Sequence, residues 1–277
     1  MLCPSFPLFF LLRNLTLSVI MSRVSGEEGR DGHLPRFFLP SDAIGADTLT
    51  LTGENARHAK VLRLQCGDAV TVCDGAGTDV SCTVQAISGE CVTLSILSRA
   101  PSSSEPETAC SVYVGFPKAD KLEHIIQKAT ELGAAEIVAF PSSRCVSRPD
   151  AKSLPKKLER WQKIAAAAAE QSGRGRIPAV LIMDSFESAL SRAASAELAL
   201  LPYENERACS IRAALCGASP KTVSVMTGPE GGFSEEEIRL ARHFQMKICT
   251  LGPRILRCET APLCALTAVL FACGALD

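Results

Sequence analysis

The regular alternation of strand-like and helix-like segments between residues 111 and 273 constrains the fold most strongly. Short runs rich in β-branched and aliphatic residues predict strands at 111–116, 136–140, 179–183, 198–201, 221–226 and 247–251. Apolar residues at helical spacing predict helices at 120–132, 153–171, 185–196, 205–215 and 260–273, and another after Ser234. Alternation over so many units predicts an α/β domain with a mainly parallel sheet and helices on both faces.

The loop at residues 227–233 (TGPEGGF) joins the strand at 221–226 to a helix with a strong start signal. Ser234 and Glu237 have the spacing of a capping box, and Phe233 and Ile238 that of a hydrophobic staple. Three glycines leave main-chain groups uncovered, and ligands of open α/β sheets bind at the carboxyl ends of strands. The loop has neither the Walker nor the dinucleotide-binding spacing, so a tight turn without a ligand is the alternative.

A second loop, residues 252–260 (GPRILRCET), follows the strand at 247–251. Thr260 is the expected cap of the next helix, Pro262 lies in its first turn and Gly274 ends it. Two consecutive strand-to-helix loops that carry Gly, Pro, Arg and Glu predict one site built from both.

Residues 35–97 have a different pattern. An extended segment at 35–40, a strand at 48–52 and a short helix at 53–63 precede three strands at 69–73, 80–87 and 91–97. Turn signals at 74–77 and 88–90 join these three strands. We expect a small antiparallel barrel or sheet at 35–99, a Pro/Ser-rich linker at 100–108 and the α/β domain at 109–277.

The composition limits the partners and the cellular compartment that can be expected for this protein. The 277 residues carry a formal net charge of −1, so there is no overall attraction to nucleic acid. The 13 cysteines are scattered without a Cys-x-x-Cys pair, which favours reduced thiols in a cytoplasmic protein and no metal site. The apolar run at 6–12 is too short to span a bilayer. We expect residues 1–34 to be a disordered leader or to precede the true start, with a signal peptide as the alternative.

Positive charge is concentrated between residues 144 and 176, a segment that contains nine Lys and Arg residues and three acidic residues. A segment with so many basic residues is often a helix face that is exposed to solvent. The alternative is a surface that follows a nucleic acid backbone, since Lys and Arg displace its counterions. The flexible Gly/Arg turn at 172–176 favours RNA.

Five segments together resemble the bacterial 16S ribosomal RNA uridine-N3 methyltransferases, which belong to the SPOUT superfamily. They are residues 35–40 (PRFFLP), 58–63 (HAKVLR), 170–174 (EQSGR), 228–234 (GPEGGFS) and 251–263 (LGPRILRCETAPL). The resemblance covers residues 35–275 in order and leaves 1–34 outside. Cys258 is a departure, because the family usually has Thr there.

The resemblance implies a PUA-like RNA-binding barrel at 35–99 and a SPOUT domain with a deep trefoil knot at 109–277. It implies S-adenosylmethionine as cofactor, 16S ribosomal RNA or the small ribosomal subunit as substrate, and a homodimer with its site between subunits. It implies cofactor binding by twelve residues: Leu201, Thr227, Gly228, Pro229, Glu230, Gly231, Gly232, Leu251, Gly252, Ile255, Leu256 and Arg257. The expected RNA-binding residues are Arg36, His58, Arg63, Lys156, Lys157, Arg160 and Arg174.

Methylation of uridine N3 requires that N3 lose its proton, because the methyl group must bond to a lone pair. The enzyme must stabilise the uridylate or supply a base. We expect Arg257 to stabilise charge on the uracil oxygens, and Glu259 or Glu230 to accept or orient the proton. The structural alternatives are that Glu259 caps the following helix and that Arg257 only holds Glu230.

Three other functions remain open from the sequence. A nucleotide-dependent oxidoreductase would use the same crevice, but the G-x-G-x-x-G spacing is absent. A non-catalytic RNA-binding factor of ribosome assembly would need no intact pair of loops. Another SPOUT enzyme would act on a different base or position.

Overall fold

The computed structural model describes residues 34–146, 148–150, 152–217 and 219–276. Apart from Leu34, the expected leader lies outside the described residues.

The first sheet has five strands in the order β1-β3-β4-β5-β2. They are β1 (Arg36–Phe38), β2 (Thr48–Leu51), β3 (Ala69–Cys73), β4 (Thr78–Ser88) and β5 (Cys91–Pro101). A short 3-10 helix, η1 (Ser41–Ala43), and α1 (Gly53–Val61) connect the first three strands. Two irregularities in the β4–β5 register act as bulges, which bend a sheet toward closure. The curled sheet and its separate core of aliphatic side chains fit the small barrel expected here.

Two details of this sheet differ from expectation. The β1 strand pairs with β3 in parallel, whereas an antiparallel sheet was expected throughout. The β5 strand continues to Pro101, inside the expected linker, because β4 is long enough to pair with it as far as Thr78.

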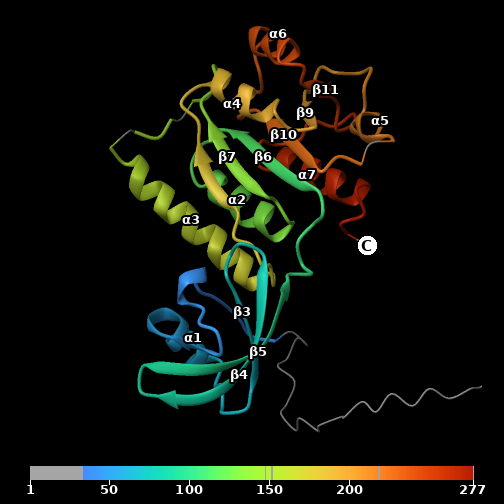
Figure 1. Ribbon diagram of the computed structural model, residues 1–277. Helices are drawn as coiled ribbons and strands as arrows, with labels where there is room; N and C mark the ends of the chain where they lie inside the picture. Colours follow the sequence, from blue (N-terminus) through green and yellow to red (C-terminus); the bar gives the residue numbers. More distant parts are fainter. Residues whose placement is uncertain (1–33, 147, 151, 218, 277) are drawn as a thin grey trace, which may run out of the picture. The chain divides into compact units, whose positions relative to one another are not determined.

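The second sheet has six parallel strands in the order β11-β9-β10-β6-β7-β8 (Figure 1). They are β6 (Ala109–Gly115), β7 (Glu136–Phe140), β8 (Ala179–Ile182), β9 (Leu198–Pro202), β10 (Thr222–Thr227) and β11 (Lys247–Cys249). The mainly parallel α/β sheet predicted from the sequence is confirmed. Every strand is parallel to its neighbours, so all their carboxyl ends lie along one edge.

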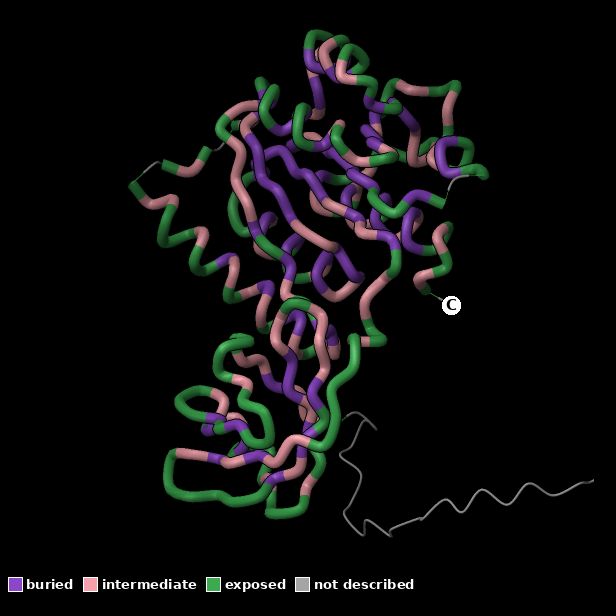
Figure 2. Tube along the Cα trace, in the orientation of Figure 1, coloured by how far each residue is buried: buried purple, intermediate pink, exposed green. Residues whose placement is uncertain are grey.

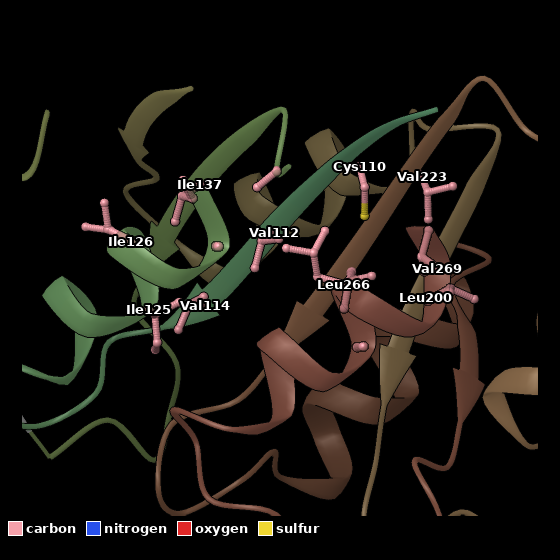
Figure 3. Packing of buried hydrophobic residues seen from close by; sticks show 14 of the residues in the cluster. Cys110, Val112, Val114, Ile125, Ile126, Ile137, Leu200, Val223, Leu266 and Val269 are labelled. Carbon is pink, nitrogen blue, oxygen red and sulfur yellow. The ribbon is translucent and has the colours of Figure 1, made fainter. Parts of the chain in front are cut away.

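Helices cover both faces of this sheet. On one face α2 (Lys121–Glu131), α3 (Leu154–Gln171), α5 (Ile211–Leu215) and α7 (Ala261–Ala272) share a core with Val112 and Val114 of β6. Figure 3 shows α2 and α7 side chains meeting strand side chains in this core. On the other face α4 (Phe186–Ala193) and α6 (Glu235–His243) pack with Tyr113 and Phe140. The strands are therefore buried between exposed outer layers (Figure 2).

The helix expected at 205–215 is wrong in its first half, since α5 begins only at Ile211. The Glu206 carboxylate accepts the backbone N–H groups of Ala208 and Cys209, and this local turn competes with a helix. Ser210 then caps α5 by accepting the Ala213 N–H. Residues 203–210 form a loop at the carboxyl edge instead.

Three helix starts differ in how they are capped. The Ser234–Glu237 capping box is confirmed, with both reciprocal hydrogen bonds present. Thr260 occupies the N-cap position of α7, but its side chain makes no capping bond, so that prediction is wrong. Its backbone is already helical and its N–H donates to the Arg257 carbonyl, so the turn starts earlier. Ser153 likewise precedes α3 without a side-chain capping bond.

The deep trefoil knot implied by the resemblance stays a prediction, as do the exact domain boundaries. Among the helices that the structure describes, none combines the length and the apolar composition that a membrane crossing requires.

Candidate functional site

Four strand-to-helix loops meet at the carboxyl edge of the parallel sheet. Strands β6, β10, β9 and β11 are consecutive neighbours, so the segments 116–120, 228–234, 203–210 and 250–260 follow them at the same edge. Crevices of this kind are the usual ligand sites of parallel α/β sheets.

These loops surround a cavity of about 400 Å³. Its lining contains every residue expected from the two glycine-containing loops: Thr227, Gly228, Pro229, Glu230, Gly231, Gly232, Leu251, Gly252, Ile255, Leu256 and Arg257. The prediction that the two loops form one site is therefore supported by their geometry. Leu201 differs, because it is 0% exposed inside the sheet and pairs with Ile248 rather than lining the cavity.

Two glycines allow the main chain of the first loop to pack closely. A Cβ on Gly115, at the end of β6, would lie 2.6 Å from Pro229 Cδ and 2.9 Å from Pro229 N. A Cβ on Gly231 would lie 2.9 Å from Arg144 Cβ, on the side of the segment after β7. Gly231 thus makes room for neighbouring protein, and the loop is held from both sides.

Several lining residues were missed by the sequence interpretation. Lys121 begins α2, and Tyr203, Glu204 and Arg207 belong to the loop after β9. A signal was present for Lys121, since the polar segment at 117–121 (PKADK) follows a predicted strand. The sequence does not reveal that this strand, β6, lies beside β10 in the sheet.

Lys121 is the centre of a charged cluster at the cavity. Its ammonium lies 3.0 Å from Glu230 Oε1 and 3.1 Å from Glu259 Oε2. The Cys258 thiol lies 3.6 Å from the same ammonium and donates to Glu259 over 3.2 Å. Burial raises the pKa of the Cys258 thiol to about 12, so it stays protonated at neutral pH. The thiol therefore supplies a hydrogen bond at the position where the family usually has a Thr hydroxyl.

Both carboxylates of this cluster are held in their charged form. Partial burial acts to raise the pKa of Glu230, but hydrogen bonds from its own and the Lys118 backbone N–H and from Lys121 lower it to about 2. The pKa of Glu259 is lowered by its own backbone N–H, by Cys258 and by Lys121. Carboxylates this weakly basic are poor proton acceptors near neutral pH.

Arg257 lies in the cavity lining and is exposed. Within the described ranges, no ion pair or hydrogen bond of its guanidinium is recorded, and Glu230 pairs with Lys121 instead. The alternative in which Arg257 merely holds Glu230 is therefore not the arrangement seen here.

The expected RNA-binding residues fall into two groups. Arg63, Lys156 and Lys157 are exposed, and Arg160 is exposed while its guanidinium lies 2.7 Å from Glu123. Arg36, by contrast, pairs with Asp79 through both terminal nitrogens.

Arg174 and His58 make internal contacts. Arg174 is 3% exposed, and its guanidinium donates to Glu105 and to the carbonyls of Thr130 and Ala134. This buried network stabilises the interior, and Arg174 is not available to phosphates in this arrangement. His58 Nδ1 lies 2.9 Å from Glu170 Oε1.

Within the part of the chain that the structure describes, no group of three or more His, Cys, Asp or Glu side chains is placed to hold a metal ion.

Comparison with known proteins decides the family. A family model described as RNA methyltransferase domain matches residues 104–270, which is more than half of the chain. The chain belongs to the RNA methyltransferase family. A model described as RNA methyltransferase PUA domain matches residues 51–97 of the same methyltransferase, over most of the first sheet. This membership goes against the oxidoreductase alternative.

Curated relatives and a solved structure agree with the family models. The methyltransferase is 38% identical over 232 residues to ribosomal RNA small subunit methyltransferase E of Bacillus subtilis (strain 168), covering 82% of this chain and 91% of that protein. It is 32% identical over 260 residues to the protein of the same name from Synechocystis, covering 92% and 84%. A crystal structure of ribosomal RNA small subunit methyltransferase E from Neisseria gonorrhoeae bound to S-adenosyl methionine matches with a TM-score of 0.75 and 34% identity. That match covers 85% of this chain and 96% of the other.

Proposed function

We propose that this methyltransferase transfers the methyl group of S-adenosylmethionine to N3 of a uridine in 16S ribosomal RNA. The observation that carries the proposal is the single cavity formed by the loops at 227–233 and 251–257. Its support is the similarity, over most of both chains, to small-subunit ribosomal RNA methyltransferases.

The residues around the cavity fit S-adenosylmethionine. A volume of about 400 Å³ lies within the range of roughly 300–1,000 Å³ typical of small-molecule sites. Bare main chain at Gly228 to Gly232 and at Leu251 and Gly252 can bind the adenine edge and the ribose. Ile255 and Leu256 supply apolar contacts for the ring, and the Lys121–Glu230–Glu259 cluster borders the same cavity. When bound, S-adenosylmethionine supplies a methyl group on a good leaving group.

In the proposed mechanism Arg257 acts on the acceptor. Uridine N3 becomes nucleophilic when its proton leaves to solvent, and the negative charge then spreads onto the two uracil oxygens. The exposed Arg257 guanidinium has no recorded partner in the described residues and can stabilise that charge. Glu230 and Glu259 hold and orient neighbouring groups, because their lowered pKa values make them poor bases. Of the two routes open from the sequence, stabilisation of the uridylate is thus the one we propose.

The exposed basic residues of α3 are proposed to bind ribosomal RNA phosphates, with Arg63 as a further candidate. Replacing Lys156, Lys157 and Arg160 together with Gln should weaken RNA binding and reduce the slope of log affinity against log salt by about 2, since each lost phosphate contact removes about 0.7–0.9. Fluorescence anisotropy with a small-subunit RNA fragment at several salt concentrations measures this slope. An unchanged slope would show that this helix face is only solvated.

A homodimer is proposed from the surface of α7. This helix carries no charged residue, yet Phe271 near its carboxyl end is 68% exposed, and Ile255 in the cavity lining is 86% exposed. A helix that is apolar all round is normally covered. Because α7 begins with Ala261 in the cavity lining, a second copy of the chain that covers this helix along its length would also border the cavity, which agrees with a site between subunits.

Phe271→Glu should convert the dimer to a monomer, because it would bury a charge in an apolar interface. Light scattering after size-exclusion chromatography measures the mass. Leu97→Glu is the matched control, since Leu97 is also apolar and 64% exposed but lies on β5. A Phe271→Glu protein that stays dimeric would place the interface elsewhere.

The decisive experiment is methyl transfer to small ribosomal subunits and to free 16S RNA, followed by mass spectrometry of the nucleosides. The expected product is N3-methyluridine, and its absence from RNA of cells lacking this protein supports the same assignment. Methylation of another base or position would favour another specificity of the superfamily. RNA binding without any methyl transfer would favour a non-catalytic assembly factor. A ribosomal substrate and the free cysteines in the described residues support a cytoplasmic location.

A further inference from the structure

Lys121 lies where three loops of the cavity meet. It is the first residue of α2, directly after the loop that follows β6. Its ammonium contacts Glu230 in the loop after β10 and Glu259 in the loop after β11, over 3.0 and 3.1 Å. Glu230 Oε1 is fixed a second time by the backbone N–H of Lys118, over 3.1 Å.

We propose that Lys121 is a positioning residue that joins the 228–232 and 252–260 loops through Glu230 and Glu259 and so keeps the cavity open for the cofactor. The inference rests on the proposed function. In this role Lys121 acts through the two carboxylates and does not itself take part in methyl transfer.

The charges around the two carboxylates show why their ion pairs with Lys121 are needed. Both oxygens lie within 3.1 Å of one nitrogen, which places them at most about 6 Å apart, a distance at which like charges repel noticeably. Among the described residues, Lys121 is the cation recorded within ion-pair distance of either one. The other groups around the cluster do not replace it. The Cys258 thiol is neutral, and Arg144 donates to the Gly231 carbonyl. Arg254 and Arg257 also line the cavity, but neither forms an ion pair with these carboxylates in the part of the chain that the structure describes. Glu204, next to Gly232, adds negative charge.

Removing the ammonium should therefore push the loops apart in a pH-dependent way. In the wild-type protein Glu230 stays charged down to a pKa of about 2, so its contacts are constant between pH 5 and pH 8. In Lys121→Met each carboxylate loses its positive partner and faces a like charge, and both effects raise its pKa. Protonation of one carboxylate as the pH falls then relieves the repulsion. The defect should be largest at pH 8 and smaller at pH 5.

Calorimetric titration of the full-length protein with S-adenosylmethionine at pH 5, 6.5 and 8 tests this. We expect Lys121→Met to bind about tenfold more weakly than wild type at pH 8 and to regain about threefold of that at pH 5, because a shifted carboxylate titrates in this window. Wild type should change little across the series. Lys118→Met is the matched control, because it removes a neighbouring lysine side chain and keeps the backbone N–H that Glu230 accepts. Lys121→Arg should retain most of the affinity.

A variant cycle separates positioning from direct contact with the ligand. In a Glu230→Gln/Glu259→Gln background the Lys121→Met change should cost less than twofold, because there is no carboxylate pair left to hold. Thermal unfolding of each variant checks that it is folded. A Lys121→Met defect that is independent of pH, or that is equally large in the double-Gln background, overturns the inference. If the wild-type protein itself binds no S-adenosylmethionine, the proposed function fails instead.

Discussion

Replacing Gly115 with valine should abolish cofactor binding. The first atom of any side chain there would lie 2.6 Å from Pro229 Cδ and 2.9 Å from Pro229 N, closer than real contacts allow. Both atoms belong to a ring and a backbone, so no flexible side chain can move aside, and the 228–232 loop must shift. A shifted loop loses several main-chain contacts to the cofactor at once. Two lost hydrogen bonds at about 1.4 kcal/mol each weaken binding about 100-fold, and we expect at least that loss of affinity. Overpacking should also lower the free energy of unfolding by about 1–3 kcal/mol.

Valine favours strands, so any loss would come from the clash and not from strand propensity. Calorimetry with S-adenosylmethionine and chemical unfolding measure the two effects. Ser111→Val is the control on the same strand, since Ser111 is half-buried at the far end of β6 from the cavity. Wild-type affinity in Gly115→Val would mean that β6 and the 228–232 loop are not packed as described.

Arg257→Ala should lower turnover by about 100- to 1,000-fold, the usual effect of removing one donor that stabilises developing negative charge. Its affinity for S-adenosylmethionine should change far less, because the main chain of the same loop supplies the cofactor contacts. The turnover defect should shrink as the pH rises, since uridine N3 then loses its proton without assistance while a guanidinium stays charged throughout. Single-turnover methyl transfer between pH 7 and pH 9 measures this.

Arg239→Ala is a suitable control for the loss of an exposed arginine, because Arg239 lies on α6 and its ion pair among the described residues is with Glu236. Equal losses in turnover and cofactor affinity for Arg257→Ala would make Arg257 a binding residue. A pH-independent loss would remove it from stabilisation of the uridylate.

The sequence predicts the parallel sheet and the two glycine-containing loops because each depends on local patterns. Strand and helix periodicity, the Ser234–Glu237 capping box and the glycines at 228, 231 and 232 are all readable within a few residues. The pairing of distant strands is not local. Lys121 becomes part of the site only because β6 lies beside β10, which follows it by more than 100 residues in the chain.

Arg174 is a second example of a residue whose surroundings depend on contacts with distant parts of the chain. The Gly/Arg turn at 172–176 is typical of an exposed, flexible segment, and the sequence interpretation assigned Arg174 to RNA. Its partners, Glu105 and the carbonyls of Thr130 and Ala134, lie far from it in sequence. Burial of an arginine depends on such partners, so composition alone could not reveal it.

The positions of the cavity-lining residues in the chain determine when, during synthesis, the cofactor can first bind. All five strands of the first sheet lie before residue 102, whereas the cavity needs Lys121, residues 202–207 and the chain up to Ala261. Chains emerge from the ribosome amino end first, at about 5–20 residues per second. The first sheet can therefore pair while the methyl donor still has no place to bind. Stabilisation of the native state by the donor through mass action begins only after α7 has emerged, so early folding must proceed without it.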